Sequence, residues 1–96
     1  MTRYKLSANV SSARPKAVEP ALEELIGNKG TIHPTDDGFQ VEATLEGTSA
    51  KDLNRQLLSA LRRLEKKTRL RSEWNSGDVT ERFFDYVPKG TKKAGP

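Results

Sequence analysis

The first pattern along the chain is a strict alternation of apolar and polar side chains over residues 3–10. Successive side chains of a β-strand point to opposite faces, so an alternation of this kind buries one face and exposes the other. The sequence therefore predicts a first strand that buries its even-numbered residues: Tyr4, Leu6, Ala8 and Val10.

The second pattern places apolar residues at helical spacing and ends at Gly27. Glycine readily adopts the left-handed conformation in which many helices stop. Pro20 has no N–H and its ring clashes with the carbonyl group four residues before it, so it fits only the first turn. The sequence therefore predicts a helix that starts near residue 16 and turns these residues to the core: Val18, Leu22, Leu25 and Ile26.

A longer helical pattern follows a capping box, in which Ser49 precedes Asp52 by three positions. The serine hydroxyl can accept a hydrogen bond from a backbone N–H of the first turn that would otherwise have no partner. We expect this helix to run from residue 50 to residue 67. Its apolar residues fall within about 100° of arc and form one stripe that faces the core: Leu53, Leu57, Ala60, Leu61 and Leu64.

Two hairpins complete the pattern. The first joins a short strand at residues 31–33 to a strand at residues 39–47, and Asp37-Gly38 between them is typical of a type I′ turn. The second joins residues 69–74 to residues 79–87 through the turn residues "NSGD". These side chains are expected to face the core: Phe39, Val41, Ala43, Leu45, Leu70 and Trp74.

The last strand is apolar on both faces. Alternation places Phe83 with Val79 and Val87 on one face, and Phe84 with Tyr86 on the other. One core cannot bury both sets, so the second face needs either a helix or a second copy of the chain to cover it. The strand is therefore a candidate for self-association in a homodimer, through Phe83, Phe84 and Tyr86.

The order of the elements predicts an α+β fold, a two-layer α/β sandwich. The order is the ferredoxin-like split βαβ arrangement, βαββαβ, with a C-terminal strand added, and such a domain has an antiparallel sheet with two helices on one face. If the strand at residues 31–33 merges with its neighbour, the order becomes βαβαββ, an alternative two-layer sandwich. We expect one α+β domain over residues 1–88 and a flexible basic tail over residues 89–96.

The composition argues against several kinds of chemistry. The 96 residues include no cysteine, which excludes disulfides, thiolate metal sites and a cysteine nucleophile and suits a reducing compartment. No apolar run is long enough to cross a bilayer, so we expect no membrane association and a cytoplasmic location. His33, Asp36 and Asp37 form a cluster that turn chemistry explains. With no nucleophile beside a base, the sequence predicts no enzyme, metal or cofactor.

Positive charge is concentrated in one short segment. Residues 62–71 carry six cations and one anion, enough to account for the whole net charge of +4. Lys51, Arg55, Arg62 and Lys66 would share one side of the long helix, within about 60° of one another and opposite the leucines. The candidate residues for binding a polyanion are Lys51, Arg55, Arg62, Arg63, Lys66, Lys67, Arg69 and Arg71.

The βαββαβ order resembles RNA-recognition motifs in architecture, and those domains stack bases on aromatic residues of their two central strands. Here the outward positions of residues 3–10 and 39–47 hold no aromatic side chain. The sequence therefore favours binding of RNA or DNA through charge on the backbone, without base stacking.

Two functions remain open from the sequence. The first is a small interaction module that binds a nucleic-acid backbone through the basic helix face. The alternative is a structural or protein-interaction subunit that self-associates through its C-terminal strand, with the basic face serving solubility. Cations near a helix C-terminus also complement the helix dipole, so the basic segment has a purely structural explanation as well.

Overall fold

The structure is a computed structural model and describes residues 2–85 and 87–88. Along the described residues, the structure has two helices, five longer strands, a short 3-10 turn after the first helix and a final strand of two residues. In order they are β1 (Thr2–Ser11), α1 (Pro15–Leu25), η1 (Gly27–Lys29), β2 (Gly30–Pro34), β3 (Gly38–Gly47), α2 (Ala50–Leu64), β4 (Arg69–Ser76), β5 (Val79–Phe84) and β6 (Val87–Pro88).

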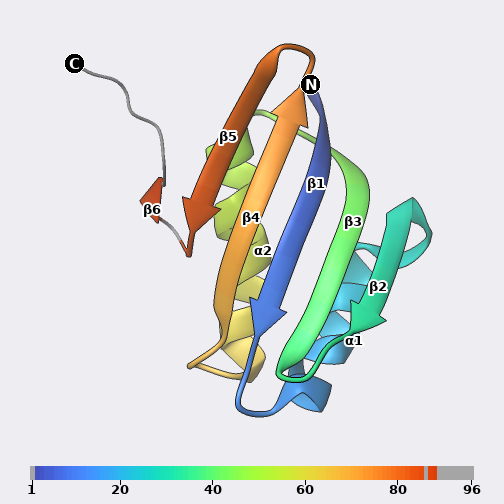
Figure 1. Ribbon diagram of the computed structural model, residues 1–96, viewed down its shortest axis with the longest axis vertical. Helices are drawn as coiled ribbons and strands as arrows, with labels where there is room; N and C mark the ends of the chain where they lie inside the picture. The colour runs from blue at the N-terminus through green and yellow to red at the C-terminus, as the bar shows by residue number, and fades with distance from the viewer. Residues whose placement is uncertain (1, 86, 89–96) are drawn as a thin grey trace.

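The strands form one antiparallel sheet in the order β2-β3-β1-β4-β5-β6. Both helices lie against the same face of this sheet, and the described part of the chain places no element over the other face (Figure 1). The α+β class is therefore confirmed. Since β2 and β3 are separate strands, the alternative order βαβαββ is wrong.

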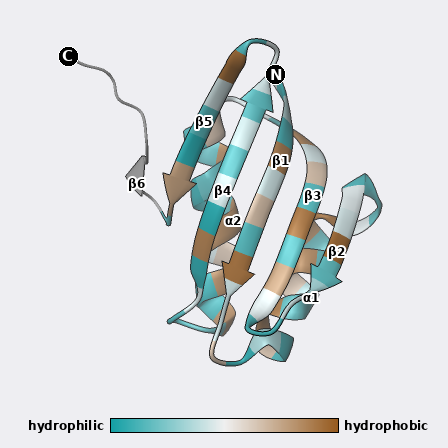
Figure 2. Ribbon diagram, viewed as in Figure 1, coloured by the Kyte–Doolittle hydropathy of each residue, from teal (hydrophilic) through white to brown (hydrophobic). Residues whose placement is uncertain are grey.

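The core lies between the sheet and the helices. The even-numbered residues of β1 from Tyr4 to Val10 are buried as predicted, and they meet Val18, Leu22 and Ile26 of the first helical segment, none of which retains exposed surface. Figure 2 shows hydrophobic and hydrophilic residues alternating along β1 and β3, which gives the sheet one apolar face and one polar face. We call the polar face, which the helices leave uncovered, the open face.

Helix α1 begins one residue earlier than predicted and holds Pro20 as its sixth residue. The expectation that Pro20 would lie in the first turn is therefore wrong. The missing N–H leaves the carbonyl group of Lys16 without its usual helical partner. This lost hydrogen bond is near the start of the helix, and both Lys16 and Pro20 are exposed. Gly27 has a φ of 49°, so it ends the helical path in the predicted way.

The turn between β2 and β3 differs from the prediction. A type I′ turn needs positive φ at both central residues, and neither Asp37 nor Gly38 has one. Gly38 instead belongs to β3, where it is buried against β1. A Cβ atom at this position would lie 1.7 Å from the carbonyl oxygen of Val10. Close approach of two strands, rather than turn conformation, is what requires glycine here.

Helix α2 is capped as predicted but ends three residues early. The Ser49 hydroxyl accepts a hydrogen bond from the backbone N–H of Asp52 at 3.0 Å. Glu65 adopts an extended conformation and stops the helix. The buried side is also rotated from the predicted stripe, because Asn54 and Leu58 are fully buried whereas Leu64 is 50% exposed. The expectation that Leu64 faces the core is wrong.

Candidate nucleic-acid interface

The eight cations predicted to bind a polyanion fall into two groups along the chain. Lys51 and Arg55 lie in the first two turns of α2, at its N-terminal end. Because α2 stops at Leu64, Lys66 and Lys67 lie in the following turn and do not extend a helical stripe. The remaining cations follow one another from the end of α2 to the start of β4: Arg62, Arg63, Lys66, Lys67, Arg69 and Arg71.

The exposed members of the second group form what we call the basic corner: Arg63, Lys66, Lys67, Arg69 and Arg71. The corner lies where α2 ends and the chain turns into β4 (Figure 1). Among the described residues, the side chains of Arg63, Lys66 and Lys67 have no ion-pair partner. Three cations are thus presented to solvent without an ion pair, although the Glu65 carboxylate accepts a hydrogen bond from the backbone N–H of Lys67 at 3.1 Å.

Asp85 is the carboxylate that lies beside the basic corner. Its Oδ2 lies 3.2 Å from the guanidinium of Arg62 and 3.7 Å from that of Arg69, which links the helix end to β4. Its Oδ1 accepts a hydrogen bond from the backbone N–H of Leu70 at 2.9 Å. Arg62 also donates to the carbonyl oxygen of Thr68 at 2.9 Å. Arg62 is therefore a structural clamp across the turn, and we leave it out of the corner.

Asp85 also has a backbone conformation that few residue types tolerate. Its φ is 60°, and it is the only non-glycine residue with positive φ in the described part of the chain. Aspartate and asparagine adopt this left-handed conformation more readily than other side chains with a Cβ atom. Both backbone polar groups of Asp85 are bound as well, its N–H to the carbonyl oxygen of Leu70 and its carbonyl oxygen to the amide of Asn54.

Asn54 connects this arrangement to a polar network inside the core. The side chain is completely buried on α2. Its Nδ2 donates to the carbonyl oxygen of Asp85, and its Oδ1 accepts from Ser72 Oγ and from Trp74 Nε1. The Trp74 N–H also lies 3.1 Å from Ser72 Oγ. Helix α2, strand β4 and the end of β5 are therefore held together by one set of buried hydrogen bonds.

The basic corner continues onto the open face through Arg69 and Arg71. Their guanidinium carbons lie 5.0 Å and 5.3 Å from the centroid of the Phe84 ring, within the range of cation–π attraction. Phe84 belongs to β5 and stands opposite Arg71 in the register of β4 and β5. A cavity of about 190 Å³ lies between these side chains and β1, where Asn9 and Ser11 line it.

The rest of the open face is polar and balanced in charge. Arg3 pairs with Glu46 at 3.4 Å, and Arg82 pairs with Glu73 at 2.7 Å. The outward positions of β1 and β3 hold no aromatic side chain, as the sequence indicated. Among the residues that the structure describes, the aromatic side chain on this face is Phe84 on β5, which lies away from the two central strands.

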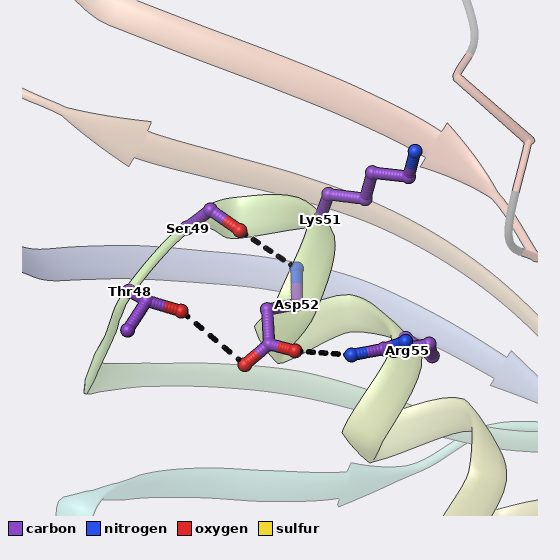
Figure 3. Close-up of a pocket in the computed structure, with 5 residues that line it drawn as sticks. All are labelled: Thr48, Ser49, Lys51, Asp52 and Arg55. Carbon is purple, nitrogen blue, oxygen red and sulfur yellow. Dashed lines mark hydrogen bonds and ion pairs between the residues drawn. The ribbon is translucent and has the colours of Figure 1, made fainter.

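The N-terminal end of α2 forms a pocket of about 440 Å³ that includes Lys51 and Arg55 (Figure 3). Asp52 lies at its centre and accepts hydrogen bonds from Arg55, Gln56 and Thr48. The hydrogen bond from Arg55 is the main reason that the pKa of the Asp52 carboxyl is below its usual value. Since these polar groups satisfy one another, the pocket is explained as a helix cap.

The aromatic residues predicted to mediate self-association lie in different places. Phe83 is 3% exposed and fills the core beneath β5, so its ring is not on a free surface. Phe84 lies on the open face with the two arginines of β4. Tyr86 and the predicted basic tail at residues 89–96 lie outside the described residues. Phe83 and Phe84 therefore lie on opposite faces of β5 and do not share one surface.

Other kinds of site find no support in the residues that the structure describes. No group of three or more His, Cys, Asp or Glu side chains could hold a metal ion there. His33 lies exposed near the end of β2, and Asp36 and Asp37 are exposed in the loop that follows. Within the same residues, no helix has the length and apolar character needed to cross a membrane.

Comparison of the chain with protein-family models, with curated proteins and with solved structures finds no match. The geometry and charge of the molecule itself are therefore the indications of its function.

Several residues at this end of the molecule could not be identified from the sequence as part of a site. One feature of the sequence could have indicated that Asn54 is special. It stands at helical spacing among buried residues of α2, where an apolar side chain is usual. Asp85 falls within the strand predicted at residues 79–87, whereas in the structure it follows the end of β5. The sequence predicts Asn9 only as an outward-facing strand residue, and Ser11 lies beyond the predicted alternation. The strand that carries Phe84 to this side of the sheet follows much later in the chain.

Proposed function

We propose that this domain is a non-enzymatic module that binds RNA or DNA by its phosphate backbone, through the basic corner. The observation that supports this most directly is the exposure of Arg63, Lys66 and Lys67 at one corner, with no carboxylate paired to them among the described residues. Lysine and arginine side chains that neutralise phosphates release counterions, and this release supplies most of the sequence-independent affinity for nucleic acid.

The geometry favours the corner over the helix face considered from the sequence. Arg55 is held by Asp52, and Arg62 is held by Asp85 and by the carbonyl oxygen of Thr68. Arg55 and Arg62 are seven positions apart, so their Cα atoms lie about 10 Å from each other along the helix axis. The corner instead joins the end of α2 to the open face without a break, because Arg69 follows the turn that carries Lys66 and Lys67.

A charge reversal in the corner tests this function. Lys66→Glu with Lys67→Glu is expected to abolish binding of a fluorescein-labelled 12-mer at 50 mM salt, since neither side chain makes an ion pair that folding requires. For the wild type, about five phosphate contacts predict a loss of affinity of about a hundredfold between 50 and 200 mM salt. Fluorescence anisotropy measures both effects.

The matched control reverses the same number of charges outside the corner, at Lys29 and Lys51, which are both exposed. This variant is expected to keep most of the wild-type affinity. Equal losses in the two double variants would mean that net charge alone matters and would remove the corner from the proposal. A wild type that does not bind any oligonucleotide at 50 mM salt would end it.

We also propose that the fold is a ferredoxin-like split βαβ domain with an added C-terminal strand. The support is the order β2-β3-β1-β4 within the sheet, in which each helix connects two parallel strands separated by one antiparallel neighbour. Folds of this type carry many unrelated functions, so the assignment adds nothing to the choice of ligand.

Self-association through β5 is a second candidate that one observation favours. The outer edge of β5 from residue 79 to residue 82 has no partner strand in the described part of the chain, and Val79 is 56% exposed. An exposed strand edge can pair with its equivalent in another copy.

This candidate predicts a concentration-dependent dimer in sedimentation velocity. Val79→Lys is expected to dissociate it by placing a charge on the edge, whereas Thr44→Lys, an exposed strand position on the central strand β3, is expected to leave it intact. If the wild type sediments as a monomer at all concentrations up to about 100 μM, self-association is excluded as the function in that range.

A further inference from the structure

The cavity on the open face combines two chemical features that a phosphate-binding surface alone does not need. Its lining supplies hydrogen-bond donors from two strands: the guanidinium groups of Arg69 and Arg71 on β4, and the side chains of Asn9 and Ser11 on β1. It also has an aromatic wall, the ring of Phe84 from β5. The β4–β5 hairpin and the distant strand β1 therefore build one small site.

The two arginines differ in whether a carboxylate of the described residues pairs with them. Arg69 shares Asp85 with Arg62, at 3.7 Å, so part of its charge is compensated. Arg71 has no carboxylate partner among the described residues, and it is exposed. A guanidinium presents five donors in one plane and can stack on an aromatic ring while its edge binds a phosphate. Arg71 can therefore bind an anion and remain against Phe84.

We propose that the cavity binds one nucleotide of a single-stranded nucleic acid. Arg71 and Arg69 bind the phosphate, and the side chains of Asn9 and Ser11 hydrogen-bond to the sugar or base edge. The base stacks on the layer that Phe84 forms with the guanidinium groups over its ring. This inference rests on the proposed function and adds a substrate class to it.

Single strands are favoured over duplexes by the position of the aromatic group. In a duplex the bases are stacked on one another, so their faces cannot reach a protein ring unless a nucleotide is extruded. The bases of a single strand are free to stack on aromatic or guanidinium planes. Phe84 lies on a sheet face that no described element covers, next to the basic corner that would bind the neighbouring phosphates.

The experiment compares the binding of three fluorescein-labelled probes to the 96-residue chain: a thymidine 12-mer, a 12-mer of the same phosphate number made of abasic sites, and a 12-base-pair duplex. We expect the wild type to bind the thymidine strand about tenfold more tightly than the abasic strand, because stacking of one base contributes about 1–3 kcal/mol and 1.4 kcal/mol is a factor of ten. Phe84→Leu is expected to bind both strands with the affinity that the wild type has for the abasic strand.

Arg71→Gln has a matched control in Arg3→Gln, which removes one charge from the same face at its opposite end. Only Arg71→Gln is expected to lower the affinity for the thymidine strand, by about tenfold. Thermal midpoints establish that each variant is folded, and if Phe84→Leu is not, Arg71→Lys tests the same site by keeping the charge and removing the plane.

The outcomes separate the two proposals. Equal affinity of the wild type for the thymidine and abasic strands would overturn the nucleotide site and leave backbone binding by the corner in place. Tighter binding of the duplex than of the thymidine strand would also overturn it. No binding to any of the three probes would remove the function on which the site depends.

Discussion

Replacing Asn54 with leucine is expected to lower the free energy of unfolding by about 3 kcal/mol, although leucine has the same number of side-chain heavy atoms and a higher helix propensity. Asn54 is fully buried and satisfies polar groups on two other elements. Leucine would leave the carbonyl oxygen of Asp85 without the Asn54 donor and the hydroxyl proton of Ser72 without its acceptor, while Ser72 Oγ still accepts from Trp74 Nε1. Each buried polar group left unsatisfied costs about 1–3 kcal/mol.

Thermal and urea denaturation measure this effect. For a chain of this length a loss of about 3 kcal/mol corresponds to a fall in midpoint of about 15 °C. Ser72→Ala is expected to cost less, because Asn54 Oδ1 keeps its hydrogen bond from Trp74. In the double variant the two losses should not add, since the variants remove members of one network. Additive losses, or a leucine variant as stable as the wild type, would contradict the role assigned to Asn54.

The matched control for this prediction is Gln56→Leu on the same helix. Gln56 is exposed, and its amide donates to the carboxylate of Asp52 rather than to the core. The same change of side chain is therefore expected to alter stability by less than about 0.5 kcal/mol, as is usual for surface positions. The comparison separates the buried network from any general effect of placing leucine on α2.

Local patterns in the sequence predicted the elements well where one short-range rule decides the outcome. The alternation over residues 3–10 and the capping box at Ser49 needed no information from the rest of the chain, and both are confirmed. The turn at Asp37-Gly38 was wrong because its glycine serves a contact with Val10 on another strand. Rules for turns cannot anticipate a contact between residues that are distant in the sequence.

The candidate site was predictable in its charge and not in its shape. The segment from Arg62 to Arg71 is identified from composition alone, and five of its six cations form the basic corner while Arg62 is held by Asp85. The end of α2 was placed three residues late, so a continuous helical stripe was expected where the structure has a turn. The cavity beside Phe84 depends on the register of three strands, which only the assembled sheet defines.

Asp85 links the stability of the fold to the charge of the corner. Its carboxylate stabilises the folded chain through the backbone of Leu70 and through Arg62. The same carboxylate places a negative charge beside Arg69, which lines the cavity. A phosphate that approaches this end of the molecule is attracted by the arginines and repelled by Asp85. Stability and affinity should therefore respond in different ways to substitutions at this one position.

Asp85→Ala is expected to lower the free energy of unfolding by about 3 kcal/mol, from the lost acceptor for the Leu70 N–H and the strain of a left-handed alanine. Asp85→Asn is expected to cost less than about 1 kcal/mol, since asparagine tolerates this conformation, can still accept that hydrogen bond and loses only partly exposed ion pairs. Denaturation of the two variants measures the difference.

The asparagine variant is also expected to bind the thymidine 12-mer about threefold more tightly than the wild type, because one unit charge about 7 Å from a phosphate contributes about 0.6 kcal/mol in water. Asp78→Asn, which removes an exposed negative charge from the turn between β4 and β5, is the control and should leave the affinity unchanged. A gain of affinity in both variants would reflect net charge only. No gain at Asp85 would mean that the bound phosphate does not lie beside Arg69, and the cavity would then need a different ligand.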